Sequence, residues 1–129
     1  MNTNWKPADH NSLSPYLMVA DAEATIAFAT EVFGAVEIAR HPGPGGRIMH
    51  AELRFGDSVL MLAQASSAWP ALPVHLHLYV SDVDACHARA IAAGARSLQE
   101  PVRKGDPDRR GGFVAPDGIV TWWVATHSA

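Results

Sequence analysis

The chain carries the same short phrase twice, as YLMVADAEA at residues 16–24 and as HLYVSDVDA at residues 77–85. Each copy begins with an apolar run typical of a strand and then reaches Asp21 or Asp82, which is a good helix N-cap. Gly34 and Gly94 follow where the end of a helix favours a residue in the left-handed conformation. The repeat therefore predicts two copies of a strand–helix unit in one chain.

The segments around these units complete two equivalent halves. Strands are expected at residues 15–19, 36–40, 48–55 and 58–64 in the first half, and at residues 74–80, 95–101, 112–116 and 119–126 in the second, with a charged loop at 102–111. This pattern predicts an α+β fold of two tandem βαβββ modules that form a curved mixed sheet around a cavity. We expect one domain over residues 1–129, made of a loose leader (1–11), a first module (12–65), a linker (66–73) and a second module (74–129).

Composition narrows the class of protein. The chain has 129 residues, of which 48% are hydrophobic and 18% charged, with a net charge of −3, so it can bury a core and offers no basic surface for nucleic acid or an anionic membrane. Its single cysteine, Cys86, excludes an intrachain disulfide and fits a reducing compartment. No signal peptide and no membrane-length apolar run is found, so we expect a cytoplasmic location with neither membrane nor nucleic acid as partner.

The strand at residues 74–80 places two histidines and a tyrosine on one face. His75, His77 and Tyr79 alternate with apolar residues, and neighbouring strand residues point to opposite faces. The apolar face is expected to pack under the helix, and the polar face to line the cavity. Tyr16 lies at the equivalent position of the first strand in the first half, so we expect it to line the cavity too. A solvated outer face is the alternative interpretation.

The same reasoning applies to residues 48–55, where His50, Glu52 and Arg54 share one face. Trp122 and Trp123 must point to opposite faces of the last strand, and we expect Trp122 to border the cavity. Convergence of polar and aromatic side chains on one cavity favours a binding site over a solvated surface. The predicted ligand-binding residues are His50, Glu52, His75, His77, Tyr79, Trp122, Met61 and Tyr16.

Several phrases along residues 13–127 carry a family resemblance. They are PYLMVADAEATIAF, EVFGAVEIAR, GRIMHAELRFGDSVLML, HLYVSDVDA and APDGIVTWWVATH. With them the chain resembles the vicinal oxygen chelate superfamily, which has the glyoxalase/bleomycin-resistance fold, and is most similar to its PhnB-like branch. The resemblance implies the predicted fold, but the superfamily includes isomerases, epimerases, dioxygenases, thiol transferases and drug-binding proteins without catalytic activity.

The resemblance also implies where a metal ion would bind. Metal-dependent members have one ligand near the start of each module's first strand and a carboxylate in each last strand, positions that align here with Ser14, His75, Met61 and Trp122. A hydroxyl, a thioether and an indole cannot replace two carboxylates and an imidazole. We therefore expect no metal and no other cofactor. A displaced site made from His50, Glu52, His75 and His77 is the alternative.

Three functions remain open from the sequence. The favoured one is a metal-free small-molecule binding protein that sequesters a drug or metabolite with a planar or aromatic structure. By analogy with resistance proteins of this fold, we expect a homodimer. The second is a metal-dependent lyase, isomerase or dioxygenase with a displaced metal site. The third is a metal-free enzyme in which His75 or His77 acts as general base, with Glu52 as its orienting partner.

Overall fold

The computed structural model describes residues 4–128, which form two βαβββ modules. The first contains β1 (Tyr16–Val19), α1 (Ala22–Phe33), β2 (Val36–Pro42), a short 3₁₀ turn (Pro44–Gly46), β3 (Ile48–Phe55) and β4 (Ser58–Gln64). The second contains β5 (Val74–Tyr79), α2 (Val83–Ala92), β6 (Arg96–Arg103), β7 (Asp108–Val114) and β8 (Val120–His127). Both modules follow the order of elements that the sequence predicts.

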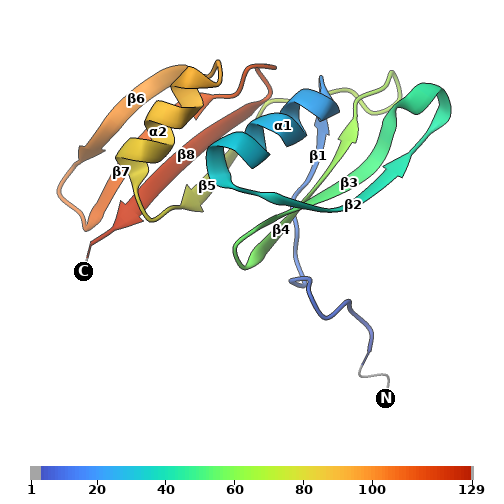
Figure 1. Cartoon of the computed structure of the whole chain (residues 1–129), viewed down its shortest axis with the longest axis horizontal. Coiled ribbons are helices and arrows are strands. Elements are labelled where there is room, and N and C mark those ends of the chain that lie inside the picture. Colours follow the sequence, from blue (N-terminus) through green and yellow to red (C-terminus); the bar gives the residue numbers. More distant parts are fainter. Residues whose placement is uncertain (1–3, 129) are drawn as a thin grey trace.

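Each module has its own four-stranded mixed sheet. The strand orders are β1-β4-β3-β2 and β5-β8-β7-β6, with the first strand of each sheet parallel to its neighbour and the other pairs antiparallel. Figure 1 shows the sheets side by side with α1 and α2 on the same side of the molecule. The predicted α+β fold of two tandem modules is confirmed, with two separate sheets.

The helix boundaries follow the local signals in the sequence. The Oδ1 atoms of Asp21 and Asp82 accept hydrogen bonds from the backbone N–H groups of Ala24 and Ala85, at 3.0 and 3.1 Å. Helix α1 ends at Gly34, which has a φ of 68° and lies in the left-handed region. These two N-caps hold equivalent places in the modules, as the repeat predicts.

The predicted loop at residues 102–111 is mostly strand, and the prediction there is wrong. Strand β6 continues to Arg103 and β7 begins at Asp108, so the connection is two residues shorter at its start and four residues shorter at its end. The charged side chains are compatible with strand structure because Arg109 pairs with Asp84 at 2.9 Å and Arg110 pairs with Asp108 at 2.9 Å. A high content of charged residues therefore does not by itself indicate a loop in this segment.

An aromatic cluster joins the two modules. Phe33, at the end of α1, packs against Trp122 of β8 and Phe113 of β7, with ring centroids 4.6 and 6.1 Å apart. Phe55 of β3 also contacts Trp122, at 5.5 Å, and Phe28 contacts Phe113 at 6.1 Å. Trp122 is only 3% exposed. The core is thus shared between the modules.

Two polar contacts also cross between the modules. The Nε atom of Arg89 in α2 donates to the carbonyl oxygen of Val32 at 3.0 Å, which satisfies a backbone acceptor in the last turn of α1. At the other end of α1, the hydroxyl of Thr25 lies 3.3 Å from Oδ2 of Asp117. Together these contacts fix both ends of α1 against the second module.

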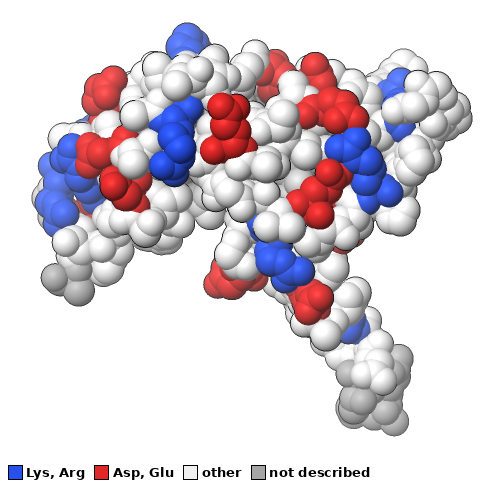
Figure 2. Space-filling view, viewed as in Figure 1, with Lys and Arg blue, Asp and Glu red and all other residues white. Residues whose placement is uncertain are grey.

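The surface on the helix side carries both signs of charge. Figure 2 shows basic and acidic side chains interspersed over this face, with the lower edge of the molecule hollowed between the second module and the N-terminal segment. Within residues 4–128, neither helix has the length and apolar character needed to cross a bilayer.

The neighbouring tryptophans of β8 test the position of the core. We expect Trp122→Ala to lower the free energy of unfolding by about 3–5 kcal/mol, because it removes the buried ring between the modules. Trp123→Ala should cost about 1 kcal/mol, because its ring lies on the exposed side of the sheet. Urea unfolding followed by far-UV circular dichroism measures both, and equal losses would place the shared core elsewhere.

Candidate functional site

Each sheet has one face that its helix leaves uncovered. Along β1 and β3 buried residues mostly alternate with more exposed ones, and along β5 half-buried residues alternate with exposed ones, so every second side chain points away from the helix. We call these surfaces the first open face, which includes Tyr16, Met18, His50, Glu52, Arg54 and Met61, and the second open face, which includes His75, His77, Tyr79, Asp108, Arg110 and Trp123.

Glu52 is the centre of the first open face. Its Oε2 atom lies 2.8 Å from Nε2 of His50, and its Oε1 atom lies 2.6 Å from Nε2 of His10. The Glu52 side chain is 14% exposed. The hydrogen bond from His50, and then the one from His10, hold the pKa of Glu52 below its ordinary value of 4.5, so the group is a carboxylate at neutral pH.

The N-terminal segment contributes His10 by lying against this sheet. The carboxylate of Asp9 is 3.8 Å from the guanidinium of Arg54, and the side-chain oxygen of Asn11 accepts a hydrogen bond from the backbone N–H of Val59 at 3.1 Å. Residues 9–11 are therefore attached, in contrast to the loose leader predicted for residues 1–11. Residues 1–3 of that leader lie outside the described residues.

A hollow of about 400 Å³ opens beside Tyr16. Its walls include Met18 of β1, Met49 of β3 and Trp69 of the segment between the modules. Tyr16, Met49 and Trp69 are 49%, 53% and 69% exposed, which is unusual for such large apolar side chains. Arg47 stands at the rim, where its guanidinium binds the backbone carbonyl of Ala65. Aromatic rings and thioethers around a hollow suit a flat apolar ligand.

A second hollow of about 480 Å³ adjoins the first at Tyr16 and extends under the N-terminal segment. Two buried polar atoms in its lining, Nδ1 of His10 and Oγ of Ser14, have no hydrogen-bond partner within the described residues. Buried polar atoms nearly always find a partner, so a polar group of a ligand or a water molecule would be favoured there.

Asp108 is the centre of the second open face. It is buried, and its carboxylate binds the hydroxyl of Tyr79 at 2.6 Å, Nδ1 of His127 at 2.6 Å and the guanidinium of Arg110 at 2.9 Å. The hydrogen bond from Tyr79, followed by that from His127, lowers the pKa of Asp108, and the same contact raises the pKa of Tyr79. The Nε atom of Arg110 also donates to Nε2 of His77 at 3.0 Å.

The histidines of β5 already have partners in the chain. Partial burial, and then the charge of Arg110, lower the pKa of His77, so its neutral ring can accept the hydrogen bond from that guanidinium. The indole N–H of Trp123 donates to Nδ1 of His75 at 3.0 Å, and the two rings are stacked. Each histidine thus has one ring nitrogen occupied, which reduces its value as a general base.

The indole of Trp123 lies over Gly112 of the neighbouring strand. A Cβ atom at this position would be 2.4 Å from Cζ3 of Trp123, so any larger residue would displace the ring. The prediction that Trp122 borders the cavity with the histidines is corrected here, because Trp122 points into the core and Trp123 is paired with His77 across β5 and β8. Trp122 reaches only the inner wall of a small hollow of about 250 Å³ next to Leu76 and Leu78.

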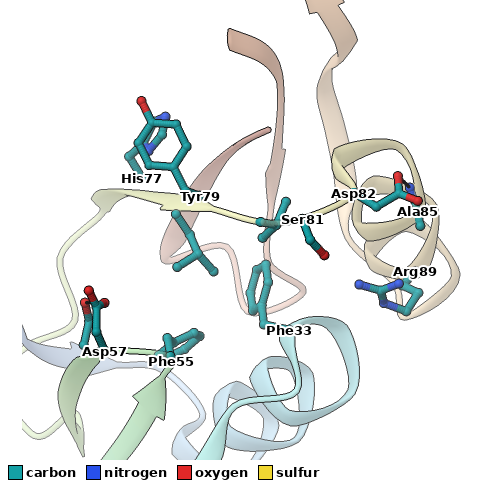
Figure 3. A pocket seen from close by; sticks show the side chains of 13 residues that line it. Phe33, Phe55, Asp57, His77, Tyr79, Ser81, Asp82, Ala85 and Arg89 are labelled. Atoms are coloured by element: carbon teal, nitrogen blue, oxygen red, sulfur yellow. Dashed lines mark hydrogen bonds between the residues drawn. The ribbon is translucent and has the colours of Figure 1, made fainter. Parts of the chain in front are cut away.

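A cleft of about 610 Å³ lies between the modules. Figure 3 shows His77 and Tyr79 on one side of β5 and Phe33 on its other side, within the cleft. Its charged side chains already have partners, since Asp57 accepts a hydrogen bond from the hydroxyl of Ser58 at 2.9 Å, Asp82 caps α2 and Arg89 binds the backbone of α1. We therefore place the candidate ligand site at the first open face.

The eight predicted site residues do not surround a single cavity within the chain. They divide into Tyr16, His50, Glu52 and Met61 on the first open face, His75, His77 and Tyr79 on the second, and Trp122 in the core. The displaced metal site would need histidines from both faces. Among residues 4–128, no group of three or more His, Cys, Asp or Glu side chains is placed to hold a metal ion.

Sequence reasoning missed His10, Asp108, Arg110 and Trp123 as members of these faces. For β7, the alternation of Asp108, Arg110 and Gly112 could have indicated a strand. The contact between His10 and Glu52 has no local signal, because 42 residues separate them in the chain.

Comparisons with known proteins agree with this architecture. A model of the Glyoxalase/Bleomycin resistance protein/Dioxygenase superfamily matches residues 9–122. The uncharacterized protein Mb0911c of Mycobacterium bovis is 40% identical over 106 residues, which cover 74% of this chain and 67% of that protein. Two Mycobacterium tuberculosis proteins match at the same identity over 60% of their length, so this chain spans roughly three fifths to two thirds of these relatives.

Two solved structures are similar over most of the chain. TioX from Micromonospora sp. ML1 has a TM-score of 0.76 and 26% sequence identity, with 91% of this chain and 98% of TioX covered. TnmS3 from Streptomyces sp. CB03234, described as an antibiotic binding protein, has a TM-score of 0.69 and 26% identity, with coverage of 92% and 100%.

The carboxylate of Glu52 makes a pH-dependent contribution to stability. Because folding lowers its pKa, this contribution is complete above the ordinary value of 4.5 and is lost as the pH falls through the lowered value. We expect Glu52→Gln to cost about 1.5–3 kcal/mol at pH 7, and the difference from wild type to shrink at acid pH. Urea unfolding at a series of pH values measures it. Glu31→Gln, at an exposed position of α1, is the control, and a difference for Glu52→Gln that does not change with pH would contradict the ionised network.

Proposed function

This chain belongs to the Glyoxalase/Bleomycin resistance protein/Dioxygenase superfamily, and we propose that it is a metal-free small-molecule binding protein that sequesters a drug or metabolite. The observation that carries the proposal is the convergence of exposed Tyr16, Met49 and Trp69 on one hollow of the first open face. Large apolar side chains gathered in a concavity are typical of ligand sites in soluble proteins.

The ligand that fits this surface is flat and mainly apolar. The rings of Tyr16 and Trp69 offer stacking surfaces, while Met18 and Met49 have flexible thioether side chains that adapt to different shapes. The likeness to TnmS3, an antibiotic binding protein, supports a binding function of this kind. A planar aromatic drug or metabolite is therefore the class of ligand that we propose.

Binding without a metal ion is supported by the side chains at the positions that the family resemblance aligns with ligands. Met61 is a weak ligand for hard metal ions, and the strand register puts Trp123, not Trp122, at the equivalent place in the second module. His75 has one nitrogen bound to Trp123, and the cationic Arg110 touches His77. The positive charge of Arg110 beside His77 would repel a metal ion bound to that histidine.

The proposal extends to three finer points. We place the chain in the PhnB-like branch, on the phrases that carry that resemblance, and in the cytoplasm, on its single buried cysteine. We also propose a homodimer, by analogy with the resistance proteins of this fold that the chain resembles.

Removal of Trp69 tests the ligand site. We expect a planar aromatic compound, found by thermal-shift screening, to raise the melting temperature of the wild type. Trp69→Ala should weaken its binding about tenfold or more, because the exposed ring supplies a stacking surface. Isothermal titration calorimetry measures the change in the dissociation constant.

Leu72→Ala is the matched control, since Leu72 lies in the same segment, is also 69% exposed and does not line the hollow. It should bind the same compound as well as the wild type does. A screen in which no planar compound raises the melting temperature, or equal binding by wild type and Trp69→Ala, would contradict this site.

Metal content separates the proposal from a metal-dependent enzyme. After incubation with Zn²⁺, Ni²⁺, Mn²⁺ or Fe²⁺ and removal of free metal, we expect elemental analysis to find no stoichiometric ion in the wild type. A stoichiometric ion that is lost in His75→Ala would overturn metal-free binding and favour a lyase, isomerase or dioxygenase.

A further inference from the structure

Three side chains of the first open face form a continuous chain of hydrogen bonds. Glu52 binds Nε2 of His50 at 2.8 Å, and Nδ1 of His50 lies 3.1 Å from the hydroxyl oxygen of Tyr16. Tyr16 and Glu52 both pair with Met61 of the central strand, and the rings of Tyr16 and His50 are 5.2 Å apart. These hydrogen bonds thus connect Tyr16, at the ligand hollow, to the carboxylate of Glu52.

The positions of the protons follow from the ionised state of Glu52. A carboxylate can only accept hydrogen bonds, so Nε2 of His50 carries a hydrogen. A neutral imidazole then has its lone pair on Nδ1, which accepts the O–H hydrogen of Tyr16. His10 holds the second oxygen of Glu52 and completes the support of the carboxylate. A carboxylate behind an imidazole stabilises the cation that forms when the ring takes a proton.

Tyr79, the other tyrosine of the chain, has the opposite surroundings. Its hydroxyl donates to the carboxylate of Asp108, and this contact raises its pKa because a phenolate would face a second negative charge. The exposed fractions of the two tyrosines are similar, 49% for Tyr16 and 58% for Tyr79. A difference in their reactivity would therefore report the hydrogen-bond partner and not access from solvent.

We propose that Tyr16, with His50 and Glu52 behind it, is a general acid–base group that exchanges a proton with the ligand. The proton of the Tyr16 hydroxyl moves to Nδ1 of His50, and the phenolate oxygen then takes a proton from an acidic O–H or C–H group of the ligand. The products are the ligand anion and the His50 imidazolium paired with Glu52. The reverse transfers restore the starting state, so no other reactant is needed.

This step rests on the proposed function, because the ligand must occupy the hollow lined by Tyr16, Met18 and Trp69. It narrows the ligand class to planar compounds that carry a weakly acidic proton, such as a phenol or an enolisable carbonyl compound. It also assigns the role of base to His50, in place of His75 or His77. The donor to His50 is a phenol, whereas the donors to His75 and His77 are the indole of Trp123 and the guanidinium of Arg110, which hold their protons far more tightly.

Tyrosine acetylation tests the relay without any ligand. The folded protein is treated with N-acetylimidazole, and modification of Tyr16 and Tyr79 is followed by peptide mass spectrometry. We expect Tyr16 to react about tenfold faster than Tyr79, because its proton can pass to a base. His50→Gln, which keeps a polar side chain but cannot accept the proton, should reduce Tyr16 to about the rate of Tyr79, and Glu52→Gln should reduce it in part.

The controls isolate the relay from general effects on folding. His41→Gln changes an exposed imidazole whose ring lies 5.7 Å from that of His50 but outside the hydrogen-bonded chain, and it should leave the Tyr16 rate unchanged. The Tyr79 rate should be constant in all variants, and Tyr16→Phe confirms the assignment of the fast site. Equal rates for both tyrosines in the wild type, or a Tyr16 rate that His50→Gln does not lower, would overturn the relay.

The ligand step has its own measurement, with the fluorescent planar phenol 7-hydroxycoumarin as the probe. Wild type should bind it and increase the fraction of its anion at neutral pH, whereas His50→Gln should bind it without that increase. A bound probe that stays neutral in the wild type would overturn proton transfer to the ligand. Absence of binding would instead contradict the proposed aromatic site, while the acetylation rates still decide the relay.

Discussion

The contact between Phe33 and Trp122 is the interaction on which the arrangement of the molecule depends. Phe33 ends the helix of the first module, and Trp122 lies in a central strand of the second, so their packing joins the two halves through one core. Both helices must then lie on the same side, as Figure 1 shows. The opposite faces of both sheets are left uncovered, and all of the candidate chemistry is found there.

Much of the fold could be predicted from the sequence because its signals are local. The two N-cap aspartates, the glycine after α1 and the strands β3 and β4 follow from short-range pattern, and the repeat supplies the topology. The choice between Trp122 and Trp123 could not be made in this way. A shift of one residue in the pairing of two strands moves every side chain to the other face of the sheet. The pairing of His77 with Trp123 therefore decides which tryptophan shares a face with the histidines, and it is visible only in the structure.

The candidate site was less predictable than the fold, for a related reason. His50 and Glu52 are two residues apart in one strand, and their shared face follows from strand periodicity. The contributions of His10, Tyr16 and Trp69 depend on how distant segments lie against the sheet. The repeat and the strand pattern predicted one cavity but not its division into two open faces, and the family resemblance did not correct this because membership of a family determines the fold more closely than the site.

The two open faces are built on the same scaffold yet use their carboxylates differently. Glu52 is held by two imidazoles, whereas Asp108 is held by a phenol, an imidazole and a guanidinium. Because the halves share a core but not an open face, a substitution on one face leaves the packing of the other intact. A duplicated gene with this architecture can diversify one half while the other retains its role. For the same reason, new recognition surfaces could be engineered on either half independently.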